Sequence, residues 1–267
     1  MELRLTGKRA LVTGSSSGLG EEIAKVLAAE GATVVVHGRD RARTEAVAKG
    51  IRSAGGEADV AIGDLGTDAG ADAVAAVAGS VDVLVNNVGV FDPSISWTTV
   101  TPEDWARTYN VNVIAGVRMI QRLVPGMRDR GWGRVIQISS VTGHLPQASQ
   151  PHYAASNAAR DNLAASLARE LKHSGVTSNS VAAGGMLTPA AQDYLTEIGR
   201  QQGWGEGWAE IEPRAVAELA PSDVGRVGTL REYADVVAFL ASPSAAYLTG
   251  ATLNVDGGWY DPGARSA

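Results

Sequence analysis

A glycine-rich loop near the N-terminus has the composition and spacing of a phosphate-binding turn. The segment Thr13–Gly20 reads Thr-Gly-Ser-Ser-Ser-Gly-Leu-Gly and lies between a β-branched run and a stretch of helical periodicity. Glycine permits the tight turn and lets the backbone approach a pyrophosphate, whose charge the N-terminus of the following helix stabilises. The strand before and the helix after are the context that this signal requires. We therefore predict a dinucleotide site here, with a tight turn that binds no ligand as the alternative.

Short β-branched runs alternate with alanine-rich stretches that place apolar residues at helical spacing. Strands are predicted at residues 9–13, 33–37, 58–62, 81–86, 134–139, 176–181 and 251–255, and the longer helices at 105–127, 153–173 and 231–241. Near-continuous apolar strands separated by helices indicate a parallel sheet that is covered on both faces. We expect one α/β domain spanning residues 1–267, because the chain contains no linker or low-complexity tract.

Composition excludes several classes of protein. The 267 residues include no cysteine, which excludes disulfides, thiolate metal sites and cysteine nucleophiles, and we predict no metal site. With 23 basic and 29 acidic residues, the chain is unsuited to a nucleic-acid or anionic-membrane partner. Met1–Lys8 lacks the apolar core of a signal peptide, and no apolar run approaches the ~20 residues of a membrane span. These observations predict a soluble, cytoplasmic protein.

The loop spacing, Thr-Gly-x-x-x-Gly-x-Gly, resembles that of the short-chain dehydrogenase/reductase family. Further matches follow in the family's order: Asp64-Leu65, Asn86-Asn87-Val88-Gly89 with valine in place of alanine, Asn112, and Val255-Asp256-Gly257-Gly258. The resemblance implies a single, doubly wound, Rossmann-like parallel sheet flanked by helices on both faces. It also implies cofactor contacts from Gly14, Ser16, Ser17, Gly18, Leu19, Gly20, Asp64, Leu65, Asn87 and Gly89. Ala183 departs from the pattern, since the family usually has proline there.

Cofactor choice depends on the end of the second predicted strand, which reads His37-Gly38-Arg39-Asp40. An acidic residue at this place bonds the ribose 2′-hydroxyl of NAD, whereas an arginine accommodates the 2′-phosphate of NADP. Arg39 therefore favours NADP(H), although it could also be a solvated start of the next helix. Asp40 leaves NAD possible as an acid displaced in register. Ser17 also weighs against NADP, because many NADP-using relatives have a second basic residue at that position.

The resemblance further implies hydride transfer between a nicotinamide and a carbonyl or carbinol carbon. Tyr153 matches the family's general acid/base, and Ser140, thirteen residues earlier, matches the serine that bonds the same substrate oxygen. Asn112 matches an asparagine that supports a proton-relaying water, and Met186 and Thr188 match cofactor contacts. The structural alternatives are a turn or cap for Ser140 and an amphipathic contact for Tyr153.

The lysine that the family places four residues after the tyrosine is replaced by Asn157. Residues i and i+4 share a helix face, so we expect Asn157 to face the site and bond the cofactor ribose without supplying charge. A unit charge ~4 Å away is worth at most about 4 kcal/mol at an effective dielectric of 20. We therefore expect Tyr153 to donate a proton at pH 7 but to accept one poorly. Arg160 is expected a turn too far along the helix to compensate, and His152 is expected at the surface.

These residues predict an NADP(H)-dependent oxidoreductase acting on a carbonyl or secondary alcohol, a carbonyl or 3-oxoacyl-type reductase, with an atypical tetrad of Asn112, Ser140, Tyr153 and Asn157. The alternative is a catalytically weak nucleotide-binding homologue that acts as a sensor or partner. Retention of Asn112, Ser140 and Tyr153 favours the enzyme. A lyase on the same fold is a third possibility, but such relatives lose the glycine-rich loop that this chain keeps.

Residues 186–221 interrupt the strand–helix rhythm close to the carboxyl ends of the strands, where ligands bind in such folds. We predict that they form a lid over a small carbonyl or alcohol substrate, with Trp204 and Trp208 as a packing pair. The family resemblance implies a homotetramer assembled through the two long helices and the last strand. Arginines at 118, 122 and 160 on those helices are expected to weaken one interface.

Overall fold

The computed structural model describes residues 2–92, 94–146, 148–219 and 221–259. Residues 1 and 260–267, at the ends of the predicted domain, and position 220 within the predicted lid lie outside the described residues. In the described part, seven parallel strands form one sheet in the order β3-β2-β1-β4-β5-β6-β7. The strands are β1 (Arg9–Val12), β2 (Thr33–Gly38), β3 (Glu57–Ile62), β4 (Val83–Asn86), β5 (Gly133–Ser140), β6 (Val176–Ala183) and β7 (Thr252–Val255).

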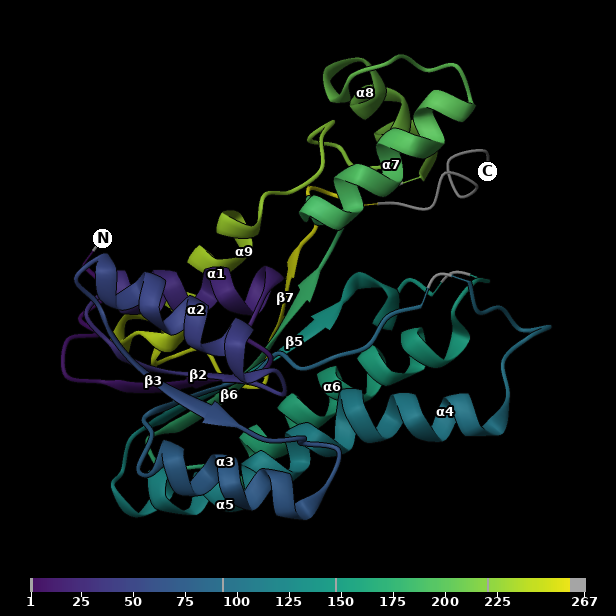
Figure 1. Cartoon of the computed structure of the whole chain (residues 1–267). Helices are drawn as coiled ribbons and strands as arrows, with labels where there is room; N and C mark the ends of the chain where they lie inside the picture. The colour runs from purple at the N-terminus through teal and green to yellow at the C-terminus, as the bar shows by residue number, and fades with distance from the viewer. Residues whose placement is uncertain (1, 93, 147, 220, 260–267) are drawn as a thin grey trace.

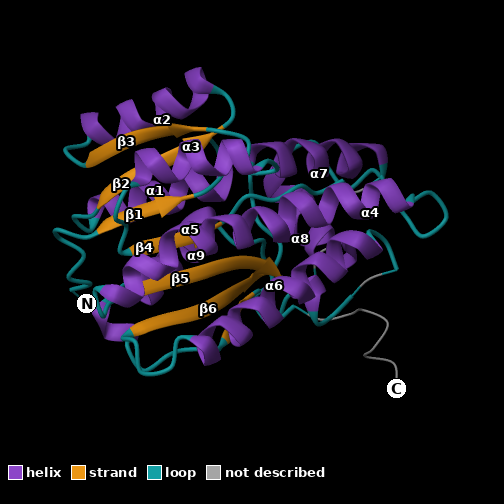
Figure 2. Ribbon diagram, turned by 90° about the horizontal axis from the view of Figure 1, so that it is seen from below, coloured by secondary structure: helices purple, strands orange, loops and turns teal. Residues whose placement is uncertain are grey.

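Helices cover both faces of this sheet (Figures 1 and 2). They are α1 (Gly18–Ala29), α2 (Arg41–Ser53), α3 (Asp68–Ala78), α4 (Pro102–Tyr109), α5 (Ala115–Asp129), α6 (Pro151–Glu170), α7 (Pro189–Gln201), α8 (Trp208–Leu219) and α9 (Leu230–Ala241), with short turns η1 (Asn110–Ile114), η2 (Val141–Gly143) and η3 (Pro243–Ala245). One apolar core lies beneath α1, α2 and α9, and a second beneath α3 and α5. The predicted doubly wound α/β sheet is confirmed.

The direction in which the chain adds strands reverses between the neighbours β1 and β4. After β1 the chain continues to β2 on one side, and after β4 it continues to β5 on the other side. The loops after these two strands therefore separate and leave a crevice at their carboxyl ends, where ligands bind in doubly wound folds. Gly14 follows β1 and Asn87 follows β4. The two motifs that the sequence singled out first thus meet at this point.

The helix predicted over residues 105–127 is interrupted. A capping box of Thr101 and Asp104 starts α4, and a π-helical turn, η1, separates α4 from α5. This turn includes Asn112, which is 2% exposed. Helical backbone nevertheless runs from Pro102 to Asp129, and apolar periodicity could not register the extra residue of the π turn, a feature frequent at functional sites.

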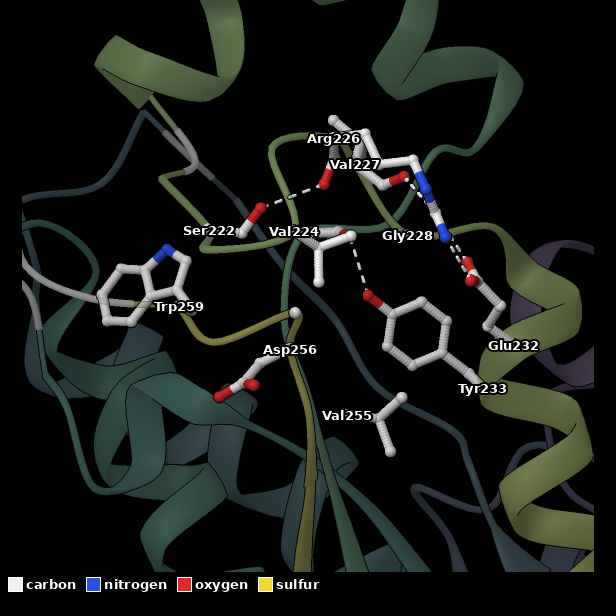
Figure 3. Close-up of a pocket in the computed structure, with 12 residues that line it drawn as sticks. Ser222, Val224, Arg226, Val227, Gly228, Glu232, Tyr233, Val255, Asp256 and Trp259 are labelled. Carbon is white, nitrogen blue, oxygen red and sulfur yellow. Dashed lines mark hydrogen bonds and ion pairs between the residues drawn. The ribbon is translucent and has the colours of Figure 1, made fainter.

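The segment of residues 186–221 contains α7 and α8, which lie beyond the sheet (Figure 1). The chain before this segment is joined to the chain after it at the base of the segment, because Gly228 donates its N–H to the Gly185 carbonyl at 3.0 Å and Leu187 donates to the Gly228 carbonyl at 2.9 Å. The Tyr233 hydroxyl also donates to the Gly185 carbonyl at 2.7 Å. Figure 3 shows the small cavity at this base, with Tyr233 reaching it from α9. The start of the segment is therefore held against the chain that leads into α9.

Three arginines of the long helices bind groups of their own chain. Arg118 bonds the Asp68 carboxylate, and Arg122 bonds the carboxylates of Asp68 and Asp72, all on the neighbouring α3. Arg160 is buried inside the protein, at 5% exposure. Each of the three therefore makes its contacts within its own chain, and their expected effect on an oligomer interface stays a prediction.

Candidate active site

The glycine-rich loop is held by hydrogen bonds to the strands on either side of it. Ser15 donates its N–H to the His37 carbonyl on β2 at 2.8 Å. The Thr13 hydroxyl accepts the Asn87 N–H at 2.9 Å, which ties the loop to the end of β4. A Cβ at Gly20 would lie 2.5 Å from both the Asn87 Nδ2 and the Gly14 oxygen, so the approach of these segments requires glycine.

His37 supports the same loop from below and was not predicted to do so. Its Nδ1 accepts the Gly14 N–H at 2.9 Å, and its Nε2 lies 3.1 Å from the Gly63 carbonyl beyond β3. Burial lowers the pKa of His37, which is 2% exposed. The neutral ring is the form that accepts at one nitrogen and donates at the other. A histidine inside an otherwise apolar strand was the available signal.

A cleft of about 400 Å³ opens along this loop. The predicted cofactor residues that line it are Gly14, Ser16, Ser17, Leu19, Gly20, Arg39, Asp64, Leu65, Asn87 and Gly89. Ser17 precedes α1 and makes no side-chain cap, which leaves the first N–H groups of that helix without this partner. A narrow backbone cradle next to a helix N-terminus suits the pyrophosphate of a dinucleotide. The residues present therefore fit such a group.

The remaining predicted cofactor residues lie outside the lining of this cleft. Gly18 is the first residue of α1. The Thr188 hydroxyl caps α7 by accepting the Ala191 N–H at 3.0 Å, and Met186 pairs with Gly228. Tyr153 and Asn157 belong to α6, further along the carboxyl edge of the sheet.

At the basic end of the cleft, Arg39 and the next residue, Asp40, have different roles. Asp40 is the N-cap of α2, and its Oδ1 accepts the Arg43 N–H at 3.1 Å. The carboxylate therefore has a local structural role, and Asp40 is absent from the cleft lining, where Arg39 and Arg43 both contribute. Arg43 was missed in the sequence; its place one turn after Arg39 was the signal. Two guanidinium groups at one end of the cleft favour an anionic group there.

Ser140 and Tyr153 are positioned by adjoining elements at the sheet's carboxyl edge. Ser140 ends β5, and its hydroxyl accepts the Thr142 N–H of the next turn at 3.3 Å. Tyr153 lies in the first turn of α6, a helix that packs against both β5 and η2. Its ring contacts Phe91 edge to face, with centroids 5.1 Å apart. Hydroxyls of a serine and a tyrosine from these two elements can bond and protonate a substrate oxygen.

Two asparagines near Tyr153 have defined partners. The Asn112 side chain accepts the Val90 N–H at 2.7 Å and donates to the Ser156 hydroxyl at 3.0 Å. Asn157 is 1% exposed, and its Nδ2 donates to the Tyr153 backbone carbonyl at 3.0 Å. Asn157 thus bonds back to its own helix, whereas the sequence predicted a contact with the ribose.

Two neighbours of Tyr153 differ from expectation. His152 is 3% exposed and packs against the Trp105 ring at 6.2 Å between centroids, so the expectation of a surface position was wrong. Residues on α4 cover that side of α6, which the helical period of α6 alone could not reveal. Arg160 points inward and donates to the backbone carbonyls of Val88, Asn112 and Ile138.

The amino-acid sequence is similar to known proteins over most of its length. A family model described as short chain dehydrogenase matches residues 8–198. An uncharacterized oxidoreductase of Bacillus subtilis is 35% identical over 97% of this chain and 98% of its own length. A 3-oxoacyl-[acyl-carrier-protein] reductase of Vibrio harveyi is 33% identical over 97% of this chain and 99% of its own length.

Solved structures match over the whole sheet. The L-sorbose reductase of Gluconobacter frateurii, complexed with NADPH and L-sorbose, is 31% identical with a TM-score of 0.90, covering 97% of this chain and 98% of that chain. A 3-oxoacyl (acyl-carrier-protein) reductase of Agrobacterium tumefaciens with NADP bound is 34% identical with a TM-score of 0.86, covering 96% of each chain. None of the described helices is both long and apolar enough to cross a membrane.

Proposed function

The chain belongs to the short-chain dehydrogenase family, and on this premise we propose that it is an NADP(H)-dependent oxidoreductase that interconverts a ketone and a secondary alcohol. The supporting observation is the cleft that joins the glycine-rich loop to Arg39 and Arg43, close to the carboxyl edge where Ser140 and Tyr153 lie. Relatives solved with NADPH or NADP bound support the choice of cofactor.

In this proposal the chain's own residues bind, orient and protonate. The loop from Gly14 to Gly20 binds the pyrophosphate, and Arg39 with Arg43 binds the 2′-phosphate. When bound, NADPH supplies the hydride. Ser140 orients the substrate oxygen, and Tyr153 donates the proton that this oxygen needs as the carbonyl carbon is reduced. Asn112 holds the backbone of Val90 in the wall between the two regions.

We further infer a catalytic set of Asn112, Ser140, Tyr153 and Asn157 that has no lysine at the fourth position. Asn157 is the member that departs from the family pattern. In the free protein its amide is used inside α6, so a ribose contact would require its side chain to rotate. Met186 and Thr188 would reach the cofactor only from the base of the segment of residues 186–221, which we propose to be the substrate lid.

A homotetramer that buries α5, α6 and the β7 edge is the assembly we propose for this cytoplasmic enzyme. Residues along β7 alternate between exposed and half-buried, which is consistent with an edge that another subunit could cover. Light scattering at micromolar concentration should give a mass four times that of the 27.6 kDa chain. A monomeric mass would contradict the assembly and leave the chemistry unaffected.

Turnover of NADPH with a panel of ketones tests the activity. The panel should contain a 3-oxoacyl thioester and a ketose, because relatives bear those substrates in their names. We expect loss of nicotinamide absorbance that depends on both the ketone and the protein. Tight NADPH binding without turnover on any ketone would instead favour the catalytically weak sensor or partner.

A further inference from the structure

Arg160 is a buried cation that the proposed function does not yet use. It is 5% exposed, and no ion pair with a carboxylate includes it among the residues that the structure describes. Its guanidinium donates to three backbone carbonyls, of Val88, Asn112 and Ile138. Burying an unpaired charge is costly, so its retention calls for a physical reason.

The guanidinium lies directly behind the wall of the cofactor cleft. Gly89 lines that cleft, and a Cβ at Gly89 would be 3.6 Å from Nη2 of Arg160 and 3.6 Å from Oδ1 of Asn112. The carbonyls that Arg160 binds belong to the segment after β4, to η1 and to β5. One side chain therefore joins three segments that surround the catalytic region.

Arg160 also lies on the same side of α6 as Tyr153. The two residues are seven apart on α6, and seven residues correspond to nearly two full turns, so both point to one side of the helix. Burial lowers the pKa of Arg160 to about 10, and the negative charge of an ionised Tyr153 acts in the opposite direction. The guanidinium therefore stays charged at neutral pH, on a residue that shares the Tyr153 side of α6.

We propose that Arg160 supplies the positive charge that Asn157 lacks, stabilising the Tyr153 phenolate from behind the cleft wall while it holds Val88 and the Asn112 carbonyl in place. The inference rests on the proposed function. Arg160 is a positioning residue that acts through Tyr153, Val88 and Asn112. Arg160 was expected a turn too far away, but its long side chain turns inward to the carbonyls of Val88, Asn112 and Ile138.

Other titratable and charged groups around α6 have separate partners or lie further toward the α4 side. They are Asp161, His144, His152, Asp92, Asp104 and Arg107. Asp161 follows Arg160 directly, but its carboxylate accepts the Ser139 and Ser180 hydroxyls at 2.6 and 2.5 Å. His144 lies 3.2 Å from the Asn254 amide, and His152 packs on Trp105. The hydroxyls of Ser139 and Ser180 therefore offset part of the negative charge next to Arg160.

Titration of the Tyr153 phenolate tests the proposal without requiring turnover. Ultraviolet tyrosinate absorbance is followed against pH in the free protein and in its NADP⁺ complex, and the Tyr153→Phe spectrum is subtracted. Arg160→Lys keeps the charge, Arg160→Gln keeps hydrogen-bond donors without charge, and Arg169→Gln on the exposed end of α6 is the control. We expect the titration midpoint in Arg160→Gln to lie at least about one pH unit above that of Arg160→Lys, equivalent to a tenfold smaller phenolate fraction.

An equal midpoint in Arg160→Gln and Arg160→Lys would overturn the proposal and leave Arg160 as a purely structural bridge. If Arg160→Gln does not fold, the unmodified protein decides: Tyr153 must titrate below free tyrosine, and a midpoint at or above free tyrosine in both samples overturns the proposal. The pH profile of alcohol oxidation should shift with the spectroscopic midpoint. Absence of any turnover would contradict the proposed function alone, because the titration does not depend on it.

Discussion

The cofactor cleft and the catalytic end of α6 lie along one edge of the sheet but are built by different means. The cleft is defined by backbone: positive φ at Gly14, the close approach of Gly20 to Asn87, and N–H groups held by strand ends. The catalytic end is defined by which way long side chains turn on a buried helix, as at Asn157 and Arg160. Steric demands on the backbone can be recognised in the sequence from residue types and spacing. The direction of a side chain depends instead on the residues that pack against it.

The variant with the largest expected effect changes the catalytic end of α6 and leaves the cofactor cleft unchanged. Tyr153→Phe removes the proton donor but none of the cleft, so we expect ketone reduction to fall by about 10²–10⁴-fold while NADPH affinity stays within a factor of two or so. Steady-state rates and fluorescence titration of NADPH measure the two quantities. Tyr247→Phe is the control, because that side chain is fully exposed. A parallel loss of affinity and rate would show that the regions are not separable in this way.

Arg39→Asp examines the basic end of the cleft. Losing a charged hydrogen bond to the 2′-phosphate costs about 1.5–3 kcal/mol, so NADPH affinity should fall by roughly 10–150-fold and NADH affinity much less. Arg41→Asp is the matched control, because Arg41 is exposed, pairs with Glu45 and does not line the cleft. Equal affinities of the unmodified protein for NADPH and NADH would contradict the assignment of Arg39.

Gly20→Ala tests whether the close approach of Gly20 to the Gly14 backbone is needed for cofactor binding in the cleft. The added Cβ would meet the Gly14 oxygen at 2.5 Å, and overpacking of this kind costs about 1–3 kcal/mol, so NADPH affinity should fall by roughly 5–150-fold. Gly50→Ala on α2 meets nothing within 4 Å and should leave affinity unchanged. Calorimetric titration of both variants provides the comparison, and unchanged binding by Gly20→Ala would mean that the loop adapts.

The smallest effect concerns His37. Burial lowers its pKa, so the unfolded chain takes up a proton more readily than the native protein as pH falls below about 6.5. The free energy of unfolding should then decrease with falling pH by at most about 1.4 kcal/mol per pH unit from this group. His37→Asn should flatten that slope and His173→Asn, at an exposed position, should not. Urea unfolding at several pH values measures it; identical slopes in all three proteins would exclude His37 as the cause.

The sequence predicted the sheet and its strands, and most residues proposed to bind the cofactor line one cleft, because apolar runs and glycine spacing reflect local requirements. It misjudged positions whose environment comes from distant parts of the chain. His152 is covered by Trp105 from α4, which lies far earlier in the chain. Arg160 was expected a turn too far from the site, since no local pattern reveals three carbonyl acceptors that lie 22, 48 and 72 residues away in the chain.

The π turn of Asn110–Ile114 has a consequence for how this protein tolerates insertions and deletions. A π turn holds about one residue more than an α turn, which rotates α5 relative to α4 by about 100°. Removing a single residue such as Val111 would restore a continuous helix, but it would turn Met119 and Leu123 of α5 away from the core. The number of residues between α4 and α5 is therefore fixed, whereas neighbouring loops could accept insertions or deletions.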